Sequence, residues 1–235
     1  MPREALITGG ARGIGFAIAN AMLESGYSVT VTGLTDDEVD NVPSRPDLKA
    51  LQLDVTDDDE VADVVASLER IDALVNCAGM IVRGGAEFTI STFRRVLDVN
   101  LVGTMRMCTA AKPKLAERQG AIVNIASIMA FIGSPLVPAY SASKGGVVQL
   151  TKALAGAWAT EGVRVNAVAP GFVVTDLSRP LVDDNVKSAS IMARTPQKRW
   201  GEPDEIGGAV AFLCSDAARF ITGSVITVDG GYTAV

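Results

Sequence analysis

The sequence predicts an α/β fold with a doubly wound, Rossmann-like parallel sheet in one domain, residues 1–235, and three observations support this prediction. Short apolar runs alternate with longer helical patterns along the whole chain, which is typical of parallel strands covered on both faces. Hydrophobic residues make up 48% of the chain, enough for a sizeable core. The chain has 235 residues without a repeat, linker or low-complexity segment, which suits a single domain.

The first predicted elements are a strand at residues 5–8, a glycine loop, and a helix at about 14–25. The loop glycines Gly9, Gly13 and Gly15 allow the backbone to approach a ligand, and the following helix N-terminus offers N–H groups and a partial positive charge. A turn that needs glycine only for packing is the alternative. The order strand, loop, helix favours binding of a phosphate-bearing cofactor over that alternative.

The rest of the chain continues the alternation. Strands are predicted at residues 28–32, 48–53, 73–75, 121–125, 163–168 and 224–228, and helices at 61–68, 90–119, 139–159 and 203–214. Pro113 is expected to kink or break the helix at 90–119. Asn100 is out of place in that apolar stretch by propensity, so it either caps a distortion or positions a water molecule. The polar, proline-broken segment at about 175–200 is expected to be an irregular loop that covers the substrate.

The end of the second predicted strand bears on the choice of cofactor. In dinucleotide folds an acid there selects NAD, whereas an arginine accommodates the phosphate of NADP. This chain has Gly33 and Leu34 at that point, so neither signal is present. The following loop, Thr35-Asp36-Asp37-Glu38 with Asp40, would repel an added phosphate, whereas Arg12 would attract it. The balance favours NAD(H) and leaves NADP(H) open.

Tyr140 and Lys144 form the candidate catalytic pair. They are four residues apart in a predicted helix, so both side chains leave the same face, one turn apart. A free phenol has a pKa of about 10, and a nearby ammonium favours the phenolate and lowers that pKa. The pair is therefore a plausible proton donor and acceptor, although such pairs also occur on ordinary helix surfaces.

Composition excludes several classes of function. The net charge is −6 and no basic run appears, which argues against nucleic acid or an anionic membrane as a partner. The chain has no histidine, so it cannot use a Ser-His or Cys-His nucleophile, and no metal site is predicted. No apolar stretch is long enough to span a bilayer, and the N-terminus leaves no room for a signal peptide. The three cysteines lack metal-ligand spacing and indicate a reduced, cytoplasmic protein.

Taken together, these motifs resemble the compact, single-domain branch of the short-chain dehydrogenase/reductase superfamily. The resemblance runs from Ala5 to about Tyr232 and rests on the following motifs: Thr8-Gly9-Gly10-Ala11-Arg12-Gly13-Ile14-Gly15, Asp54, Asn76-Cys77-Ala78-Gly79, Asn100, Ser127, Tyr140-x-x-x-Lys144 and Pro170-Gly171. This chain departs from the family at Cys77, where a second asparagine is usual, at Gly33 and Leu34, and in a short region between the second and third strands.

The resemblance implies a role for each catalytic candidate. Tyr140 would exchange a proton with the substrate oxygen, and Ser127 would hydrogen-bond that oxygen. Lys144 would lower the pKa of Tyr140 and hold the nicotinamide ribose, while Asn100 would hold a water molecule that links Lys144 to solvent. By simpler readings, Ser127 only satisfies a backbone group at a strand end and Asp54 only caps a turn.

The resemblance also implies a set of cofactor contacts. The expected residues are Gly9, Arg12, Gly13, Ile14 and Gly15 at the pyrophosphate and adenosine side, Leu34 at the adenosine ribose, Asp54 and Val55 at the adenine, Asn76, Ala78, Gly79, Tyr140 and Lys144 at the nicotinamide ribose side, and Gly171, Val173 and Thr175 at the carboxamide.

The function that follows is an NAD(P)-dependent oxidoreductase that transfers a hydride between a nicotinamide cofactor and an alcohol or carbonyl substrate. A sugar, a polyol and a 3-oxoacyl chain remain open as substrates. The alternative is a non-catalytic cofactor-binding sensor or scaffold. An epimerase or dehydratase is disfavoured because such chains resemble this one at Tyr-x-x-x-Lys but carry a larger C-terminal region. The family resemblance further implies a homotetramer.

Overall fold

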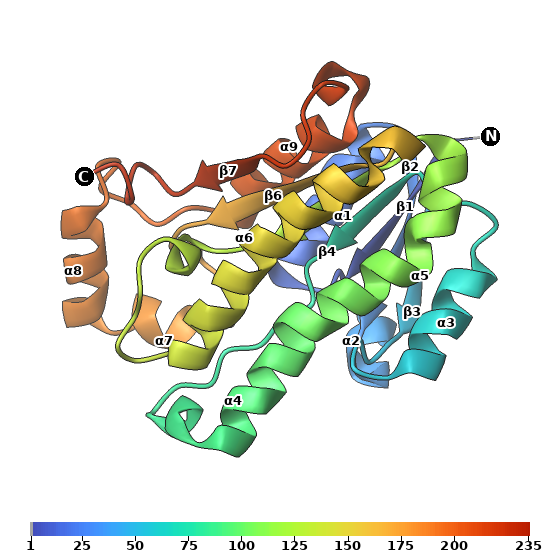
Figure 1. Ribbon diagram of the computed structural model, residues 1–235. Helices are drawn as coiled ribbons and strands as arrows, with labels where there is room; N and C mark the ends of the chain where they lie inside the picture. The colour runs from blue at the N-terminus through green and yellow to red at the C-terminus, as the bar shows by residue number, and fades with distance from the viewer. Residues whose placement is uncertain (1) are drawn as a thin grey trace.

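The computed structural model describes residues 2–235, which form a seven-stranded parallel sheet with helices on both faces (Figure 1). The strands are β1 Arg3–Thr8, β2 Tyr27–Gly33, β3 Leu48–Gln52, β4 Ala73–Asn76, β5 Ala121–Ile125, β6 Arg164–Pro170 and β7 Val225–Val228. Their spatial order is β3-β2-β1-β4-β5-β6-β7, and every neighbouring pair is parallel. All seven predicted strands are present, so the predicted fold class is confirmed.

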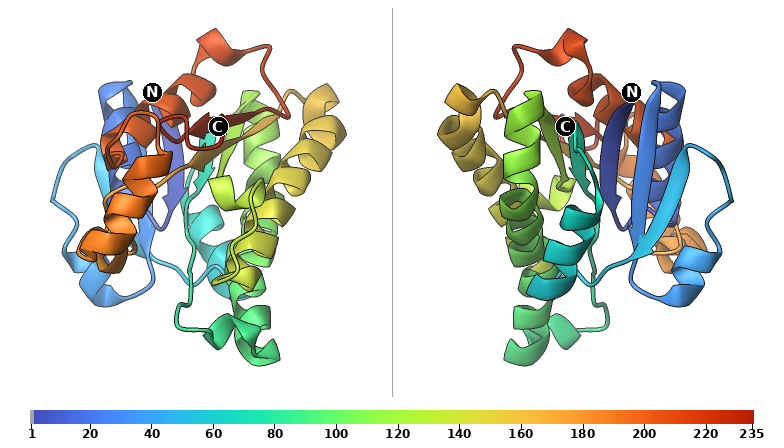
Figure 2. Two further views of the ribbon diagram at one scale, coloured as in Figure 1. Left: turned by 90° about the vertical axis from the view of Figure 1, so that its left-hand side faces the viewer. Right: turned by 90° about the vertical axis from the view of Figure 1, so that its right-hand side faces the viewer.

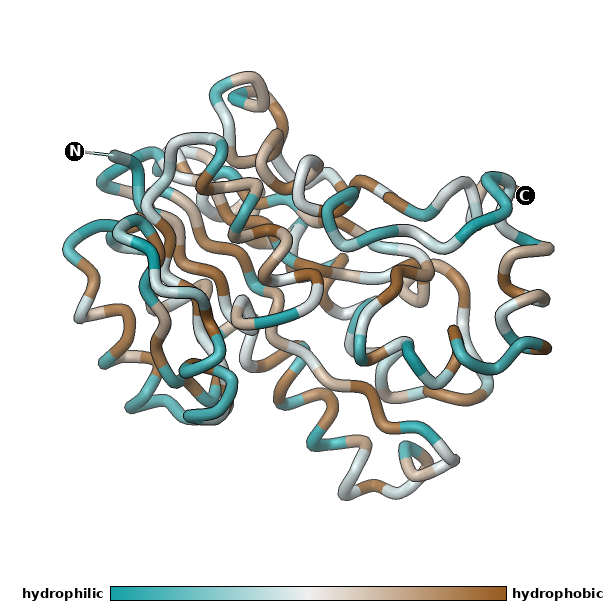
Figure 3. The backbone as a smooth tube through the Cα atoms, turned by 180° about the vertical axis from the view of Figure 1, so that it is seen from behind, coloured by the Kyte–Doolittle hydropathy of each residue, from teal (hydrophilic) through white to brown (hydrophobic). Residues whose placement is uncertain are grey.

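Two helical layers cover the sheet (Figure 2). The helices are α1 Gly13–Glu24, α2 Asp36–Asp40, α3 Asp58–Ser67, α4 Ile90–Leu97, α5 Gly103–Arg118, α6 Pro138–Trp158, α7 Arg179–Val182, α8 Asn185–Arg194 and α9 Pro203–Cys214. Helices α1 and α9 share one apolar cluster with the strands, and α3, α5 and α6 share another on the opposite face. The hydrophobic segments accordingly run through the central strands (Figure 3). No helix in residues 2–235 is long and apolar enough to cross a membrane.

The strand order indicates at which edge of the sheet a ligand would bind. The chain builds outward from β1 in one direction to β3 and then returns to add β4 on the other side of β1. In open α/β sheets a crevice forms at such a reversal, outside the carboxyl ends of the strands. The glycine loop after β1 and the small-residue turn after β4 both open at this edge.

The predicted helix at 90–119 differs from the structure in where it is interrupted. The break comes at Asp98–Val102, a π-helical turn that separates α4 from α5, and α5 continues through Pro113. Pro113 and Thr109 both lie on the exposed face of α5. Because Thr109 is four residues earlier, its carbonyl loses a helical partner but faces water, so the proline does not end the helix.

The segment at 175–200 is less irregular than expected, because it contains the short helices α7 and α8. Pro180 lies in the first turn of α7, where a missing N–H costs little. Asp184 caps α8 by accepting from the N–H groups of Val186 and Lys187, and Trp200 donates its indole N–H to Ser188 at 2.8 Å. These contacts anchor a segment that its polar composition had marked as a loop.

Candidate active site

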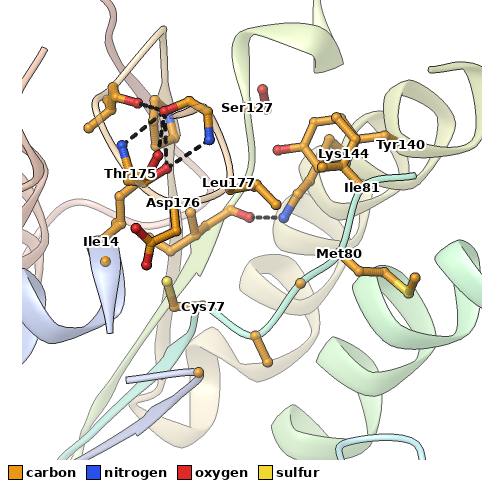
Figure 4. A pocket seen from close by; sticks show the side chains of 18 of the residues that line it. Ile14, Cys77, Met80, Ile81, Ser127, Tyr140, Lys144, Thr175, Asp176 and Leu177 are labelled. Carbon is orange, nitrogen blue, oxygen red and sulfur yellow. Dashed lines mark hydrogen bonds between the residues drawn. The ribbon is translucent and has the colours of Figure 1, made fainter. Parts of the chain in front are cut away.

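The candidate catalytic pair, Tyr140 and Lys144, lies near the N-terminus of α6, at the carboxyl end of the sheet. Tyr140 is partly buried, and Lys144 is 5% exposed with its ammonium donating to the carbonyl of Ile125 at 2.6 Å. The Lys144 nitrogen lies 5.7 Å from the centre of the Tyr140 ring. Figure 4 shows both side chains at the cavity, with the dashed line from Lys144 to the carbonyl. The predicted one-turn spacing therefore brings the two groups together.

The pKa directions differ from the simple expectation. Burial lowers the pKa of Lys144 to about 8, and nearby Cys77 opposes this. Burial also raises the pKa of Tyr140 above its ordinary value; Ser127 and Arg83 pull it down, and Cys77 and Glu87 push it up. The net direction is thus upward, where Lys144 alone had been expected to lower it. Desolvation outweighs the favourable groups because the phenolate is the charged form.

Ser127 follows β5 and begins the short 3₁₀ segment Ile128–Ala130. It is 7% exposed, and its hydroxyl oxygen accepts from the N–H of Met129 at 3.2 Å. Its interaction with Tyr140 lowers the pKa of that phenol. The strand-end role and the catalytic role are compatible, because the hydroxyl accepts with one lone pair and keeps its hydrogen for the substrate side.

Asn100 lies in the π-helical turn and is fully buried. Its amide oxygen accepts from the N–H of Met80 at 2.8 Å, and its amide nitrogen donates to the Met80 carbonyl at 2.9 Å and to the Ser143 hydroxyl at 3.0 Å. The side chain thus ties the turn after β4 to α6. Both amide hydrogens are used, so a water molecule held by this side chain would have to be the donor to its oxygen.

Glu87 is a site residue that the sequence did not reveal. It is fully buried in the 3₁₀ segment Ala86–Phe88 and accepts from the N–H groups of Val82 at 2.9 Å and Tyr140 at 3.0 Å. Tyr140 is the third residue of α6, where backbone N–H groups lack helical partners. A distant carboxylate therefore caps the helix at the tyrosine itself, and only the three-dimensional fold brings it there.

The glycine loop has the shape that a bound pyrophosphate requires. Gly9 and Gly13 have positive φ angles of 61° and 56°, which favour glycine. A side chain at Gly15 would collide with the Gly9 carbonyl, and one at Gly9 would lie 2.8 Å from the Ala78 Cα. Among the described residues, no side chain caps the N-terminus of α1 at Arg12. The first backbone N–H groups of α1 are thus available to bind an anion.

One cavity of about 900 Å³ joins the glycine loop to the catalytic pair. Nearly all the predicted site residues line it, namely Gly9, Arg12, Gly13, Ile14, Gly15, Leu34, Asp54, Val55, Ala78, Gly79, Ser127, Tyr140, Lys144, Gly171, Val173 and Thr175. Its elongated course from the α1 N-terminus to Tyr140, with glycines where a side chain would intrude, fits a dinucleotide.

Asn76 and Asn100 stand behind this lining rather than in it. The Asn76 amide nitrogen donates to the Asn124 side chain at 2.8 Å, which bridges β4 and β5 below the cavity. Asp54 reaches the cavity but also accepts from the Thr56 N–H and hydroxyl, as the simpler reading expected. The Cys77 thiol also lines the cavity, and burial raises its pKa to about 11, so it stays protonated at neutral pH.

The end of the cavity beyond Tyr140 lies under α7 and α8. Leu177, Leu181, Val186 and Ile191 give it apolar walls, while Arg83, Asp176 and Lys187 add charge. Arg83, from the loop after β4, approaches the carbonyl of Leu177 at 3.4 Å across the cavity. It is also close enough to Tyr140 to lower the pKa of the phenol. No sequence pattern marks Arg83, since it is a single charge in an irregular loop.

The chain is similar to known dehydrogenases and reductases over almost its full length. A family model described as enoyl-(acyl carrier protein) reductase matches residues 9–233. The 2-dehydro-3-deoxy-D-gluconate 5-dehydrogenase of Pseudoalteromonas atlantica is 39% identical over 98% of this chain and 95% of its own length. The 3-oxoacyl-[acyl-carrier-protein] reductase FabG of Staphylococcus aureus is 38% identical over 98% of each chain.

Solved structures show the same similarity to dehydrogenases. A gluconate 5-dehydrogenase from Burkholderia cenocepacia, solved in complex with NADP and tartrate, superimposes with a TM-score of 0.94 at 34% identity, covering 99% of this chain and 96% of that one. These similarities confirm that the chain is an NAD(P)-dependent oxidoreductase acting on an alcohol or carbonyl group, not a sensor or scaffold. The fold, the cavity and these relatives together show that the chain belongs to the short-chain dehydrogenase/reductase superfamily, in its compact single-domain form.

Proposed function

We propose that this enzyme interconverts a hydroxyl and a ketone on a sugar acid, with NAD(H) as the preferred cofactor. The observation that carries the substrate class is Arg83, a guanidinium in the substrate end of the cavity and close to the Tyr140 phenol. A guanidinium pairs well with a carboxylate, so it would hold the acid group while a carbon further along the substrate reaches Tyr140. The names of the gluconate-type relatives support the same class.

In this proposal the chain's own residues handle the proton and the positioning. The nicotinamide ring, when bound, accepts or donates the hydride. The Tyr140 oxygen takes the proton from the alcohol during oxidation and returns it during reduction. Ser127 holds the substrate oxygen in line, and donors of this kind typically contribute about 10²–10³ in rate. Lys144 places its ammonium next to Tyr140, where the ammonium donates to the Ile125 carbonyl.

Replacing Tyr140 with Phe tests the mechanism. We expect kcat to fall by about 10²–10⁴, the usual contribution of general acid-base catalysis, while cofactor affinity changes little. Tyr232→Phe is a matched control, because it removes the same hydroxyl from a residue outside the cavity lining. A Tyr140→Phe variant as active as the Tyr232→Phe variant would contradict the mechanism.

Replacing Arg83 with Ala tests the substrate class. A lost charged contact should raise the KM for gluconate by about 10- to 100-fold and leave that for an uncharged polyol nearly unchanged. Arg94→Ala is the control, because Arg94 is an exposed arginine of α4 outside the cavity lining. Equal effects on charged and uncharged substrates would argue against a sugar acid.

The proposal also includes a cytoplasmic homotetramer. The three cysteines are free thiols in the structure, as a reducing compartment would keep them. Three exposed apolar side chains support association through the helices and the C-terminal strand: Val102 at the end of the π-helical turn, Met105 on α5, and the fully exposed Phe220 before β7. Light scattering of the purified protein would measure the assembly, and a monomer at micromolar concentration would overturn this part.

A further inference from the structure

The adenosine end of the cavity contains a carboxylate that no strand end supplies. Strand β2 ends at Gly33, and Leu34 follows, so no acidic side chain stands where dinucleotide folds usually place one. Glu38, in the short helix α2, reaches back into this position. One oxygen accepts from the Leu34 N–H at 2.7 Å, and the other accepts from the Arg12 Nε at 2.8 Å.

The packing around Glu38 holds it there. A side chain at Gly33 would lie 2.9 Å from the Glu38 Cβ, so only glycine lets the α2 side chain lie against the strand end. Thr35 caps α2 by accepting from the Glu38 N–H at 3.3 Å, which fixes the helix that carries the carboxylate. The departure from the family at Gly33 therefore makes room for Glu38.

Charge on Glu38 is favoured despite partial burial. Burial alone would raise its pKa, but the bonds from the Leu34 N–H and from Arg12 outweigh that effect and bring the pKa below its usual value. Glu38 is thus an anion at neutral pH, and its pairing neutralises the guanidinium of Arg12. Asp36 and Asp37 add negative charge on the same turn of α2.

Arg12, Gly33, Leu34, Glu38 and Asp54 all line the same cavity that reaches Tyr140. The glycine loop fixes the pyrophosphate between these two ends, so the Glu38 end is the one that meets the adenosine ribose. A ribose hydroxyl donates to a carboxylate, whereas a ribose phosphate brings negative charge toward one.

We propose that Glu38 is the residue that selects NAD(H) over NADP(H) in this enzyme, both by accepting from the ribose hydroxyl and by holding Arg12 away from a ribose phosphate. The inference rests on the proposed function and deepens it, since it assigns the cofactor preference to one side chain of α2. A phosphate that approached Arg12 would compete with the Glu38 carboxylate for the guanidinium.

The test compares Glu38→Gln with Asp37→Asn. Glutamine keeps an oxygen for the Leu34 N–H but gives up the negative charge that binds Arg12. Asparagine at 37 makes the same change of net charge one residue away, at an exposed side chain outside the cavity lining. The measurement is the dissociation constant of NADH and of NADPH from the fluorescence of the bound dinucleotide, with kcat/KM for NAD and NADP as a second readout.

Wild-type enzyme should bind NADH at least about tenfold more tightly than NADPH, because a charged hydrogen bond and a repulsion both favour it. In Glu38→Gln that preference should fall by about tenfold or more, mainly through tighter NADPH binding. Adding Arg12→Gln to Glu38→Gln should remove the gained NADPH affinity, since Arg12 would be the group set free. Asp37→Asn should keep the wild-type preference.

An unchanged NADH-to-NADPH ratio in Glu38→Gln overturns the inference, and so does a wild-type preference for NADPH. In both cases turnover with either cofactor would leave the proposed oxidoreductase intact. Wild-type protein that binds neither dinucleotide would overturn the proposed function, and with it the role of Glu38.

Discussion

Lys144 shows how burial sets the chemistry of a single side chain. Its ammonium is removed from water and donates to the carbonyl of Ile125, and this burial lowers the pKa of Lys144 to about 8. Tyr140, one turn earlier, has its pKa raised by the same burial. Lys144 is therefore the first of the two to lose a proton as the pH rises.

The pH dependence of the reaction follows with a definite sign. Oxidation needs a site that can take a proton, so kcat/KM for oxidation should rise with pH and level off near pH 8, where Lys144 deprotonates. Reduction needs the proton and should fall over the same range. Initial rates in both directions between pH 6 and about 10 would check this. An oxidative limb at or above the ordinary tyrosine pKa of about 10 would show that Tyr140 titrates without Lys144.

For single residues, the sequence predicted the candidate catalytic side chains but not how deeply the fold buries them. The types and spacing of Tyr140 and Lys144 carry the chemistry and mark them as candidates, whereas the role of Ser127 is implied by the family resemblance. The upward pKa shift of Tyr140 could not be predicted, since it depends on how much water the fold excludes from the phenol.

Helix α6 depends on an element far from it in sequence. Glu87 accepts from the N–H of Tyr140 and from that of Val82, so one carboxylate joins the catalytic helix to the loop that carries Arg83. Replacing Glu87 with Ala would leave two N–H groups unpaired, and each buried unpaired donor costs about 1–3 kcal/mol. We expect a loss of about 2–5 kcal/mol in unfolding free energy by urea titration, and a lower kcat in the folded fraction.

Glu117→Ala on the exposed face of α5 is the control for that substitution. Glu87→Gln removes the negative charge but keeps the size of the side chain and an acceptor oxygen. Glu87 is one of the charges that raise the pKa of Tyr140, after burial, so the neutral amide should lower the pKa of that phenol. A Glu87→Ala variant as stable as the Glu117→Ala variant would show that water replaces the carboxylate.

Two neighbouring glycines of α9 provide a test of helix packing. A methyl group at Gly207 would lie 2.9 Å from the Ala17 carbonyl and 3.0 Å from the Ala21 Cβ, both on α1. At Gly208 nothing lies within 4 Å. We expect Gly207→Ala to cost about 1–3 kcal/mol by overpacking, and Gly208→Ala to add about 0.5–1 kcal/mol by helix propensity. Thermal unfolding of both variants would measure this, and a stabilised Gly207→Ala would mean that α1 and α9 separate easily.

At the scale of elements, apolar periodicity predicted the strands and the long helices well, because both are buried on a regular face. Apolar periodicity failed where the hydrogen bonds of single polar side chains determine the local structure. The π-helical turn forms around buried Asn100 and its bonds to Met80 and Ser143, and α8 is held by the cap at Asp184. Met80 and Ser143 lie 20 and 43 residues from Asn100, outside any local window of sequence. The cap at Asp184 is local to α8, but apolar periodicity does not register a capping residue.

The whole molecule should become more stable when a cofactor fills its long cavity. A ligand at about 100 times its dissociation constant adds about 2.7 kcal/mol, which for a chain of this size is roughly 5–10 °C in thermal midpoint. We expect NADH to give the larger shift at matched concentration. Equal shifts with NADH and NADPH would contradict the proposed preference for NAD(H).

For the molecule as a whole, the alternation of strands and helices predicted the doubly wound parallel sheet, and the glycine loop predicted where a phosphate-bearing cofactor would bind. The acidic loop favoured NAD(H), but the residue proposed to set this preference could not be predicted, because the sequence cannot show which of several acids turns inward. The structure separates Glu38, paired with Arg12, from exposed Asp37. The proposed substrate class similarly depends on Arg83, which only the folded loop brings to the cavity.

The π-helical turn between α4 and α5 has a consequence for how this segment tolerates change. A π turn holds one residue more than an α turn, so the two helices it joins are out of phase by about 100° around a shared axis. Deleting a single residue there would restore an unbroken helix and rotate Asn100 away from Met80 and Ser143. Chain length at this point is therefore as restrictive as residue identity, and a one-residue deletion should be tolerated less than most substitutions on the same helices.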